Sequence, residues 1–266
     1  MKARAANNAL PHPSNQRANV CSLHILAGWG HIPGHSLGIL NVTDDTPTTT
    51  TQTPDECPHC GKQPILCICE EIVALDNRVS LLILQHPQEQ DKTLGSARLA
   101  VHMLSNAIFK VGLSWSSLAK ALGRPADPKN WAILHLGSIQ ASDFPDGRDI
   151  AVFDAKGVAV ADQTTALNHI EGVVIFDGTW SQAKTLWWRN AWVLKARRIA
   201  LRPSTPSRYG NLRKEPRKEG LSSIEAAGMV LSRLETDPRY EEALGEAFAV
   251  MLSRFKAAKK AGLVSK

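Results

Sequence analysis

The stretch Gly172-Val-Val-Ile-Phe-Asp-Gly-Thr-Trp-Ser-Gln-Ala-Lys-Thr-Leu-Trp-Trp188 joins a short apolar run to a helical pattern. The run at 172–176 predicts a buried strand, and the amphipathic residues after the turn predict a helix. Asp177 and Gly178 lie at the junction. Because ligands in open α/β sheets bind at the carboxyl ends of strands, Asp177 is a candidate site residue. Capping of the helix by Asp177 or Thr179 is the alternative interpretation.

Other segments repeat this alternation of apolar and amphipathic stretches. Together they predict an α/β fold with a mostly parallel sheet and helices on both of its faces. One helix start, Ser222 with Glu225, is a capping box. Strands are predicted at 79–84, 131–136, 149–153 and 199–201, and helices at 93–108 and 116–122, after Asp177 to about Arg189, and from Ser222 and Asp237 onward.

The composition restricts the class of protein. Of 266 residues, 43% are hydrophobic, and the longest apolar run, at 79–84, is much too short to cross a membrane. The sequence does not open with a signal peptide. Its first acidic residue is Asp44, and an acid-free start is a feature of organellar transit peptides, but the helical periodicity here is poor. We therefore expect a cytoplasmic protein without membrane association.

Residues 1–54 differ in composition from the rest. A threonine run at 48–51 lies between two prolines, and the earlier residues mix Asn, Gly, His and Pro without periodicity. Such composition predicts a poorly ordered segment. A cysteine-rich stretch follows, and after it the α/β pattern begins. We therefore predict three parts: residues 1–54, a cysteine knuckle at 55–72 and an α/β domain at 73–266.

The cysteine knuckle has the spacing of a metal site. Four thiols within 13 residues, with Gly61 and Pro64 to turn the chain, suit tetrahedral Zn²⁺. Disulfides are the alternative, which the absent secretory signal and the odd fifth cysteine, Cys21, disfavour. A shell of four cysteines leaves no open position for water, so we expect a structural zinc. The predicted ligands are Cys57, Cys60, Cys67 and Cys69.

Positive charge is concentrated in one segment. Residues 197–218 contain eight basic residues and one acidic residue, whereas the whole chain has a formal net charge of only +6. A local basic segment on a nearly neutral protein is typical of a surface that binds a polyanion such as nucleic acid. A solvated, arginine-rich loop is the alternative.

Taken in order, several blocks of this sequence resemble the DTW-domain family, the tRNA-uridine aminocarboxypropyltransferases related to SPOUT-class RNA-modifying enzymes. The resemblance covers about residues 56–255, and the order and spacing of the blocks make it specific. The blocks are the cysteine pattern at 57–69, His86-Pro87-x-Glu89-x-x-Lys92-Thr93, Asp177-Gly178-Thr179-Trp180-Ser181-Gln182-Ala183, Ser207-Arg208-Tyr209, Leu212-Arg213-Lys214-Glu215-Pro216 and Gly220-Leu221-Ser222-Ser223-Ile224-Glu225-Ala226.

The resemblance implies an activity and a fold. Such enzymes move the 3-amino-3-carboxypropyl group of S-adenosylmethionine to N3 of a tRNA uridine. The co-substrate is then S-adenosylmethionine, the partner is tRNA, and the fold includes a SPOUT-like knot in its C-terminal part. No protein partner is predicted.

The resemblance also implies roles for individual residues. Asp177 is the candidate general base, or the group that orients uracil, a role worth about 10²–10⁴ in rate. Trp180 could stack on adenine or uracil or pack in the interior, and Thr179 could cap its helix or bind the cofactor carboxylate. The full assignment is Ser138, Thr179, Trp180 and Ser222 to the cofactor and Arg208, Arg213 and Lys214 to RNA.

Ser138 has a neighbour that departs from the family pattern, and Glu225 and His86 each have a structural alternative. Ser138 is carried over although Gly137 stands where many members have proline. Glu225 could close over the cofactor or only complete its capping box, and His86 could line the pocket or serve as a turn residue. Two other functions also stay open: a SPOUT-type RNA methyltransferase, and a zinc-knuckle RNA-binding protein without catalysis.

Overall fold

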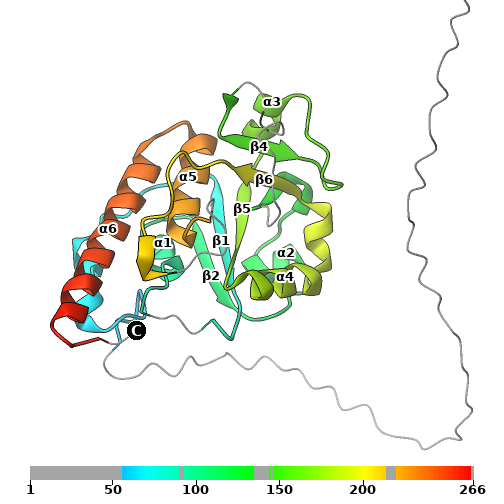
Figure 1. Ribbon diagram of the computed structural model, residues 1–266. Coiled ribbons are helices and arrows are strands. Elements are labelled where there is room, and N and C mark those ends of the chain that lie inside the picture. Colours follow the sequence, from blue (N-terminus) through cyan, green and yellow to red (C-terminus); the bar gives the residue numbers. More distant parts are fainter. Residues whose placement is uncertain (1–55, 90–92, 135–143, 145–146, 214–219, 265–266) are drawn as a thin grey trace, which may run out of the picture. The chain divides into compact units, whose positions relative to one another are not determined.

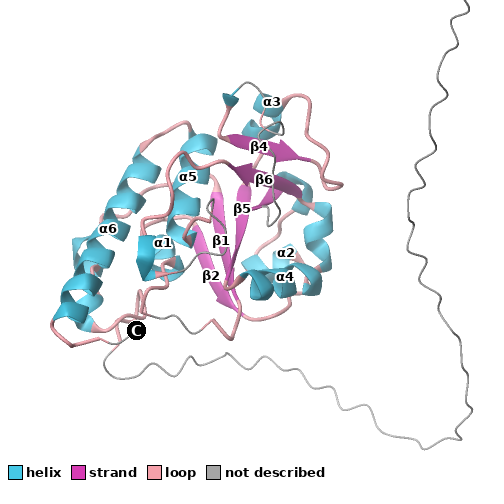
Figure 2. Ribbon diagram, in the orientation of Figure 1, coloured by secondary structure: helices cyan, strands magenta, loops and turns pink. Residues whose placement is uncertain are grey.

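The computed structural model describes residues 56–89, 93–134, 144, 147–213 and 220–264 (Figure 1), all within the unit Thr50–Lys266. Among these residues, six strands form one sheet (Figure 2). The strands are β1 (Ser80–Gln85), β2 (Ala107–Val111), β3 (Trp131–Leu134), β4 (Ile150–Phe153), β5 (Gly172–Asp177) and β6 (Arg197–Leu201).

The sheet is mostly parallel, as predicted. Its order is β2-β1-β5-β3-β6-β4, and every neighbouring pair is parallel except β4 and β6. In β1 and β5 the last paired residues are Gln85 and Asp177. These two strands therefore end side by side, and the carboxyl ends of two central strands meet at Asp177.

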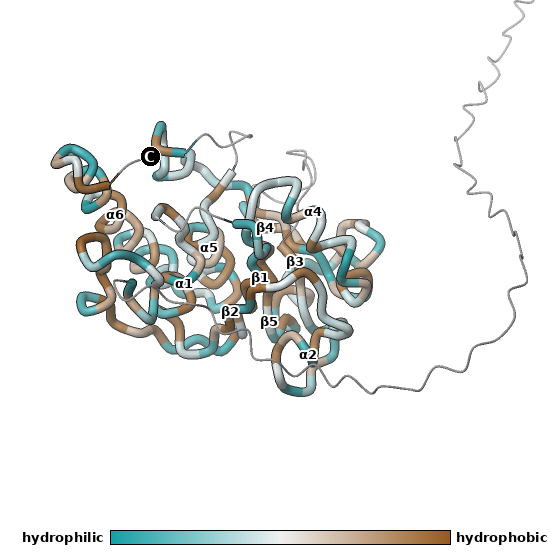
Figure 3. The backbone as a smooth tube through the Cα atoms, turned by 90° about the horizontal axis from the view of Figure 1, so that it is seen from below, coloured by the Kyte–Doolittle hydropathy of each residue, from teal (hydrophilic) through white to brown (hydrophobic). Residues whose placement is uncertain are grey.

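Helices cover both faces of the sheet (Figure 1). Side chains alternate along β1, so Leu81 and Ile83 pack with α1, α5 and α6, whereas Leu82 and Leu84 pack with α2 and α4. Hydrophobic strand segments thus lie between two groups of helices (Figure 3). The helices are α1 (Ala97–His102), α2 (Leu118–Leu122), α3 (Gln163–Asn168), α4 (Trp180–Arg189), α5 (Ser223–Glu235) and α6 (Arg239–Lys260).

Shorter 3₁₀ turns complete the described elements. They are η1 (Pro64–Leu66), η2 (Cys69–Glu71), η3 (Pro128–Asn130), η6 (Ala191–Lys195) and η7 (Gly210–Leu212). No helix among the described residues is long and apolar enough to span a membrane.

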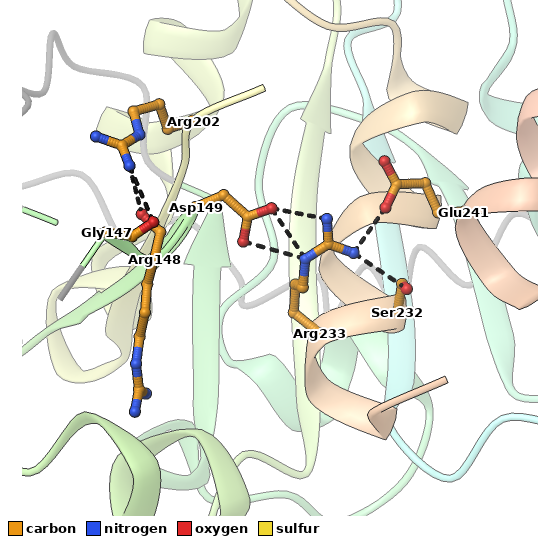
Figure 4. Close-up of polar contacts among 7 residues, drawn as sticks. All are labelled: Gly147, Arg148, Asp149, Arg202, Ser232, Arg233 and Glu241. Atoms are coloured by element: carbon orange, nitrogen blue, oxygen red, sulfur yellow. Dashed lines mark hydrogen bonds and ion pairs between the residues drawn. The ribbon is translucent and has the colours of Figure 1, made fainter. Parts of the chain in front are cut away.

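A charged network joins α5 to the start of β4 (Figure 4). The Arg233 guanidinium lies 2.7 Å from a carboxylate oxygen of Asp149 and 2.6 Å from one of Glu241. Hydrogen bonds to Asp149, and then to Glu241, raise the pKa of Arg233 above its ordinary value. The network ties α5 and α6 to the antiparallel edge of the sheet.

The helix predicted over 93–108 is wrong in its second half. The chain is helical only over α1, and Ala107 and Ile108 belong to strand β2, which the sequence reading missed. The Asn77 side chain binds both backbone groups of Asn106, accepting from its N–H at 2.9 Å and donating to its carbonyl at 3.1 Å. That clamp ends the turn and aligns β2 with β1, so tertiary contacts override the helical spacing.

Some predictions fall outside the described residues. These are the segment 1–54 and two site residues, Ser138 and Lys214. The boundaries at 55 and 73 stay predictions.

Candidate functional site

The four predicted metal ligands lie together. Their sulfur atoms are all within 4.8 Å of one another, and the four are free thiols. The Sγ atoms of Cys57 and Cys69 are 3.8 Å apart, as are those of Cys60 and Cys67. Burial raises the pKa of the Cys60 thiol to about 11. Burial therefore favours the protonated thiol in the absence of a metal. A bound cation would favour the thiolate instead, because thiolates are the form of cysteine that binds metal ions. This cluster could hold a metal ion.

The knuckle is fixed to the main body by apolar and polar contacts. Leu66 and Ile68 are buried in the same core as α1, α5 and α6. From α6, Arg254 donates to the Cys67 carbonyl and pairs with Glu71. Lys62 is only 2% exposed and donates to the carbonyls of residues 93 and 95 at 2.9 and 2.8 Å. The knuckle therefore holds the loop that precedes α1.

Asp177 ends β5 with both carboxylate oxygens engaged. Gln85, from the adjacent end of β1, donates to one oxygen at 2.7 Å, and Ser223, from the first turn of α5, donates to the other. The backbone N–H of His86 donates to the Asp177 carbonyl at 3.0 Å. The carboxylate is thus held in one orientation at the strand end, and it is not the cap of α4.

Gln85 and Ser223 were not predicted as site residues. Gln85 precedes His86 at the end of a predicted strand, so strand position was a usable signal. Ser223 lies beside Ser222 in the matching block, and nothing in the sequence distinguishes the two serines. The structure separates them, because Ser222 faces Glu225 while Ser223 faces Asp177.

The turn after Asp177 requires glycine and a capping box. Gly178 has φ of +147°, and an added Cβ would lie 2.8 Å from a Gln182 side-chain oxygen. Thr179 is the N-cap of α4, and its N–H donates to Gln182 Oε1 at 2.6 Å while its hydroxyl accepts from the Gln182 N–H. The hydroxyl of Thr179 therefore already serves the helix.

A second capping box starts α5. Ser222 is buried, and its hydroxyl bonds Glu225. The Glu225 carboxylate also accepts from the Ser207 hydroxyl at 2.6 Å and from the Arg208 N–H at 2.8 Å. Glu225 thus completes the cap, as one interpretation predicts, and also fastens the preceding loop to α5.

Tyr209 links that loop to the segment held by the knuckle. The ring is buried against Phe248, and its hydroxyl donates to the Leu94 carbonyl at 2.7 Å. Burial raises the pKa of Tyr209 to about 12, so the hydroxyl keeps its proton. Beside it, the Ile224 N–H donates to the Ser96 hydroxyl at 3.3 Å. The loop 93–96 therefore contacts both the knuckle and the start of α5.

The two described RNA candidates lie in different places. Arg213 approaches Glu89 at 3.9 Å, with side chains 26% and 8% exposed, and lies over the ring of Tyr209. Arg208 is exposed, and its guanidinium lies against Gly245 of α6. Arg213 therefore lies beside Tyr209 and Glu89, whereas Arg208 lies beside helix α6.

Other arginines of the basic segment bind protein carbonyls. Arg197 donates to Ala166, Arg198 to Ala155, and Arg202 to the carbonyls of residues 147 and 148. These three side chains fasten β6 to its surroundings. Arg197, Arg198 and Arg202 therefore have partners within the protein, and both interpretations of the basic segment stay open.

Two aromatic or imidazole candidates have structural contacts. Trp180 is half-buried at the start of α4, with the Lys184 ammonium 5.3 Å from its ring centre. His86 is buried, and its Nδ1 accepts from the Gln88 N–H at 3.1 Å, as a turn residue does. Trp187 packs edge-on against Phe176. Trp180 and Trp187 are both half-buried, whereas His86 is buried.

The geometry brings distant blocks to one place. Asp177 is bonded from β1 and from the first turn of α5, and helix α4 starts three residues after it. Helix N-termini attract anions, and a carboxylate attracts cations or accepts protons. The arrangement suits a ligand that carries both charges.

Comparisons with known proteins cover the part of the chain that contains the candidate site. Residues 54–256 match the family model described as "DTW domain". The chain is 25% identical over 203 residues to tRNA-uridine aminocarboxypropyltransferase 2 of Macaca fascicularis, covering 75% of this chain and 63% of that protein. Proteins of the same name from Mus musculus (26% over 204 residues, covering 74% and 62%) and Drosophila melanogaster (25% over 213 residues, covering 78% and 76%) are also similar.

The chain thus spans somewhat under two thirds of the length of the two mammalian relatives. No solved structure matches it. The family match extends from just before the cysteine knuckle into α6 and so includes every described block of the candidate site. The chain belongs to the DTW domain family.

Proposed function

We propose that this protein transfers the 3-amino-3-carboxypropyl group of S-adenosylmethionine to N3 of a uridine in tRNA. Family membership and the names of its relatives support this activity. The observation that carries the proposal is the Asp177 carboxylate, held at the end of β5 by Gln85 and Ser223. A structural RNA-binding protein would have no need of such a carboxylate at a strand end.

The reaction needs deprotonation and alignment. The N3–H bond of uracil and the bond from sulfur to the aminocarboxypropyl group break, an N3–C bond forms, and methylthioadenosine and a proton are released. The sulfonium of the donor supplies the leaving group. Asp177 accepts the N3 proton or orients N3–H. Its two fixed hydrogen bonds keep the carboxylate in place, which contributes through alignment.

The residues present fit the donor. Its carboxylate suits the positive N-terminal ends of α4 and α5, and its adenine suits the ring of Trp180. Because the Thr179 and Ser222 hydroxyls serve capping boxes, we propose that they hold the two helix starts in position at the donor. Ser138 is retained as a donor-binding candidate on the family resemblance.

We infer that the metal is zinc. Four sulfurs at about 2.3 Å from a tetrahedral Zn²⁺ would be about 3.8 Å apart, the separation of the two cysteine pairs. The shell would be closed, so its role is structural. For RNA, Arg213 would bind phosphate near the site, and Arg208 would do so on the α6 side. Lys214 is retained as a phosphate-binding candidate on the family resemblance.

Two finer expectations also belong to this proposal. Ser223, in the first turn of α5, donates to Asp177, so α5 begins beside the end of β5. We propose a SPOUT-like knot in this C-terminal part of the fold, which an experimental structure traced through residues 214–219 tests. We propose a cytoplasmic location, which imaging of the tagged protein tests.

Mass spectrometry of tRNA nucleosides tests the activity. Purified protein is incubated with S-adenosylmethionine and unmodified tRNA, and both nucleosides and small products are analysed. We expect uridine to gain the aminocarboxypropyl mass and methylthioadenosine to accumulate. A methyl gain with S-adenosylhomocysteine would identify a methyltransferase instead, and tRNA binding without either product would identify a binding protein.

A further inference from the structure

The outward face of α4 carries a line of aromatic and basic side chains. Trp180, Lys184 and Trp188 are four residues apart, so they follow one another along the helix, whereas Ala183 and Leu186 face the core. Trp188 is 78% exposed. Tryptophan side chains normally bury a large apolar area in a core or at an interface. The Trp188 side chain does not do so within the described part of the protein.

The charge of this face favours an anionic partner. The sequence of α4 contains Lys184 and Arg189, both exposed, and no acidic residue. The Lys184 ammonium already lies over the Trp180 ring, 5.3 Å from its centre. Aromatic rings interleaved with cations bind single-stranded nucleic acid, because bases stack on the rings and phosphates pair with the cations.

The line also continues from the candidate active site. Trp180 is three residues from Asp177, and Trp188 lies two turns further along α4, about 12 Å away at 1.5 Å per residue. Stacked bases are spaced about 3.4 Å apart. The face is therefore long enough for several nucleotides on one side of a uridine at Asp177.

We propose that this face binds the single-stranded nucleotides of tRNA that flank the target uridine. Trp188 stacks on one base, and Lys184 and Arg189 contact phosphates. The placement of these nucleotides beside a target uridine rests on the function proposed above. The binding of RNA to this face does not depend on that function.

Binding of an unmodified tRNA transcript to the full chain tests the proposal. We expect Trp188→Ala to raise the Kd about 5- to 100-fold, the effect of losing one base stacked on an aromatic ring. Trp188→Phe retains a ring and should restore most of the affinity, whereas Trp188→Leu retains only apolar area and should not. Leu194→Ala, which truncates another exposed apolar side chain, is the matched control and should bind as wild type does.

Salt dependence tests the phosphate contact. We expect Lys184→Ala to reduce the slope of log K against log salt by about 0.7–0.9, the value for one phosphate. An unchanged slope overturns the phosphate contact of Lys184.

Three results would overturn the stacking proposal. They are unchanged affinity in Trp188→Ala, full affinity in Trp188→Leu, which would show that apolar area without an aromatic ring is enough for the contact, and a wild-type chain that does not bind tRNA. Failure of the proposed function is distinguishable, because it appears as absent product while the Trp188 variants still lose affinity. In an active enzyme, Trp188→Ala should raise KM for tRNA and leave the single-turnover rate at saturating tRNA unchanged.

Discussion

The cysteine knuckle and the Asp177 site are built in opposite ways. All four knuckle thiols come from 13 consecutive residues. Asp177 is instead held by side chains 92 and 46 residues away in the sequence. A local cluster can form as soon as its metal binds, whereas the Asp177 site forms only once the sheet and α5 are in register. The first is therefore visible in residue spacing and the second is not.

The two regions are nevertheless joined through one loop. Lys62 of the knuckle donates to the carbonyls of residues 93 and 95, and Tyr209 donates to the Leu94 carbonyl between them. Ser96, next in sequence, accepts from the first turn of α5. We therefore expect knuckle changes to alter stability first and activity second, and Asp177 changes to alter mainly activity.

Loss of the metal should have the largest effect. Structural zinc contributes an apparent binding free energy of about 10–16 kcal/mol in small domains. We expect Cys60→Ser to lose the metal and to lower Tm by roughly 10 °C or more, since several kcal/mol are lost in a chain of this size. Metal content by mass spectrometry and calorimetry measure this. Cys21→Ser is the matched control, because that cysteine precedes Cys57 by 36 positions in the sequence and is not part of the metal-site spacing. Full metal content in Cys60→Ser would contradict the assignment.

Asp177→Asn should have the second largest effect, and mainly on rate. The amide keeps the shape of the side chain but cannot accept a proton, so we expect the single-turnover rate to fall by about 10²–10⁴. Metal content and tRNA affinity should stay at wild-type values, and Tm should fall by only a few degrees, because the amide can accept only one of the two hydrogen bonds that the carboxylate accepts. Asp127→Asn, a cap of the η3 turn, is the control carboxylate. An Asp177→Asn enzyme as fast as wild type would remove Asp177 from the chemistry.

The parts of the fold that could be predicted were those with local signals. The apolar runs of β1 and β5, the capping box at Ser222 and the cysteine spacing each depend on neighbouring residues. Strand β2 was missed because its residues continue a helical spacing until Asn77, 29 residues away, fixes Asn106. The spacing of apolar residues within a segment carries no information about a contact with a residue so distant in the sequence.

The site shows the same limit. Asp177 was predictable from its place at a strand end, but Gln85 and Ser223 become its partners only through the register of β1 with β5 and the position of α5. The basic segment was read from charge alone, and packing then assigned Arg197, Arg198 and Arg202 to backbone carbonyls. Sequence gives the types of residue present, and tertiary contacts decide which are available.

Lys62→Met tests the link between the two regions. The substitution leaves the thiols in place but removes the buried ammonium. The carbonyls of residues 93 and 95 therefore lose the hydrogen bonds that it donates to them. We expect a stability loss of about 2–4 kcal/mol with full metal content. We also expect lower activity, because the loop that contacts Tyr209 is released. Exposed Lys129→Met is the control. Wild-type activity in a destabilised Lys62→Met protein would show that the regions are independent.

The smallest expected effects distinguish capping from donor binding at the edge of the Asp177 site. Thr179→Ala and Ser222→Ala each remove one N-cap hydroxyl, which should cost about 1 kcal/mol and lower Tm by a few degrees. Ser117→Ala removes the cap of α2 and provides the matched loss of stability. If the hydroxyls contribute only to stability, all three variants keep the wild-type KM for S-adenosylmethionine. A higher KM in Thr179→Ala or Ser222→Ala than in Ser117→Ala would mean that the cap acts at the donor, by contact or by positioning its helix start, because stability loss alone would raise KM equally in all three.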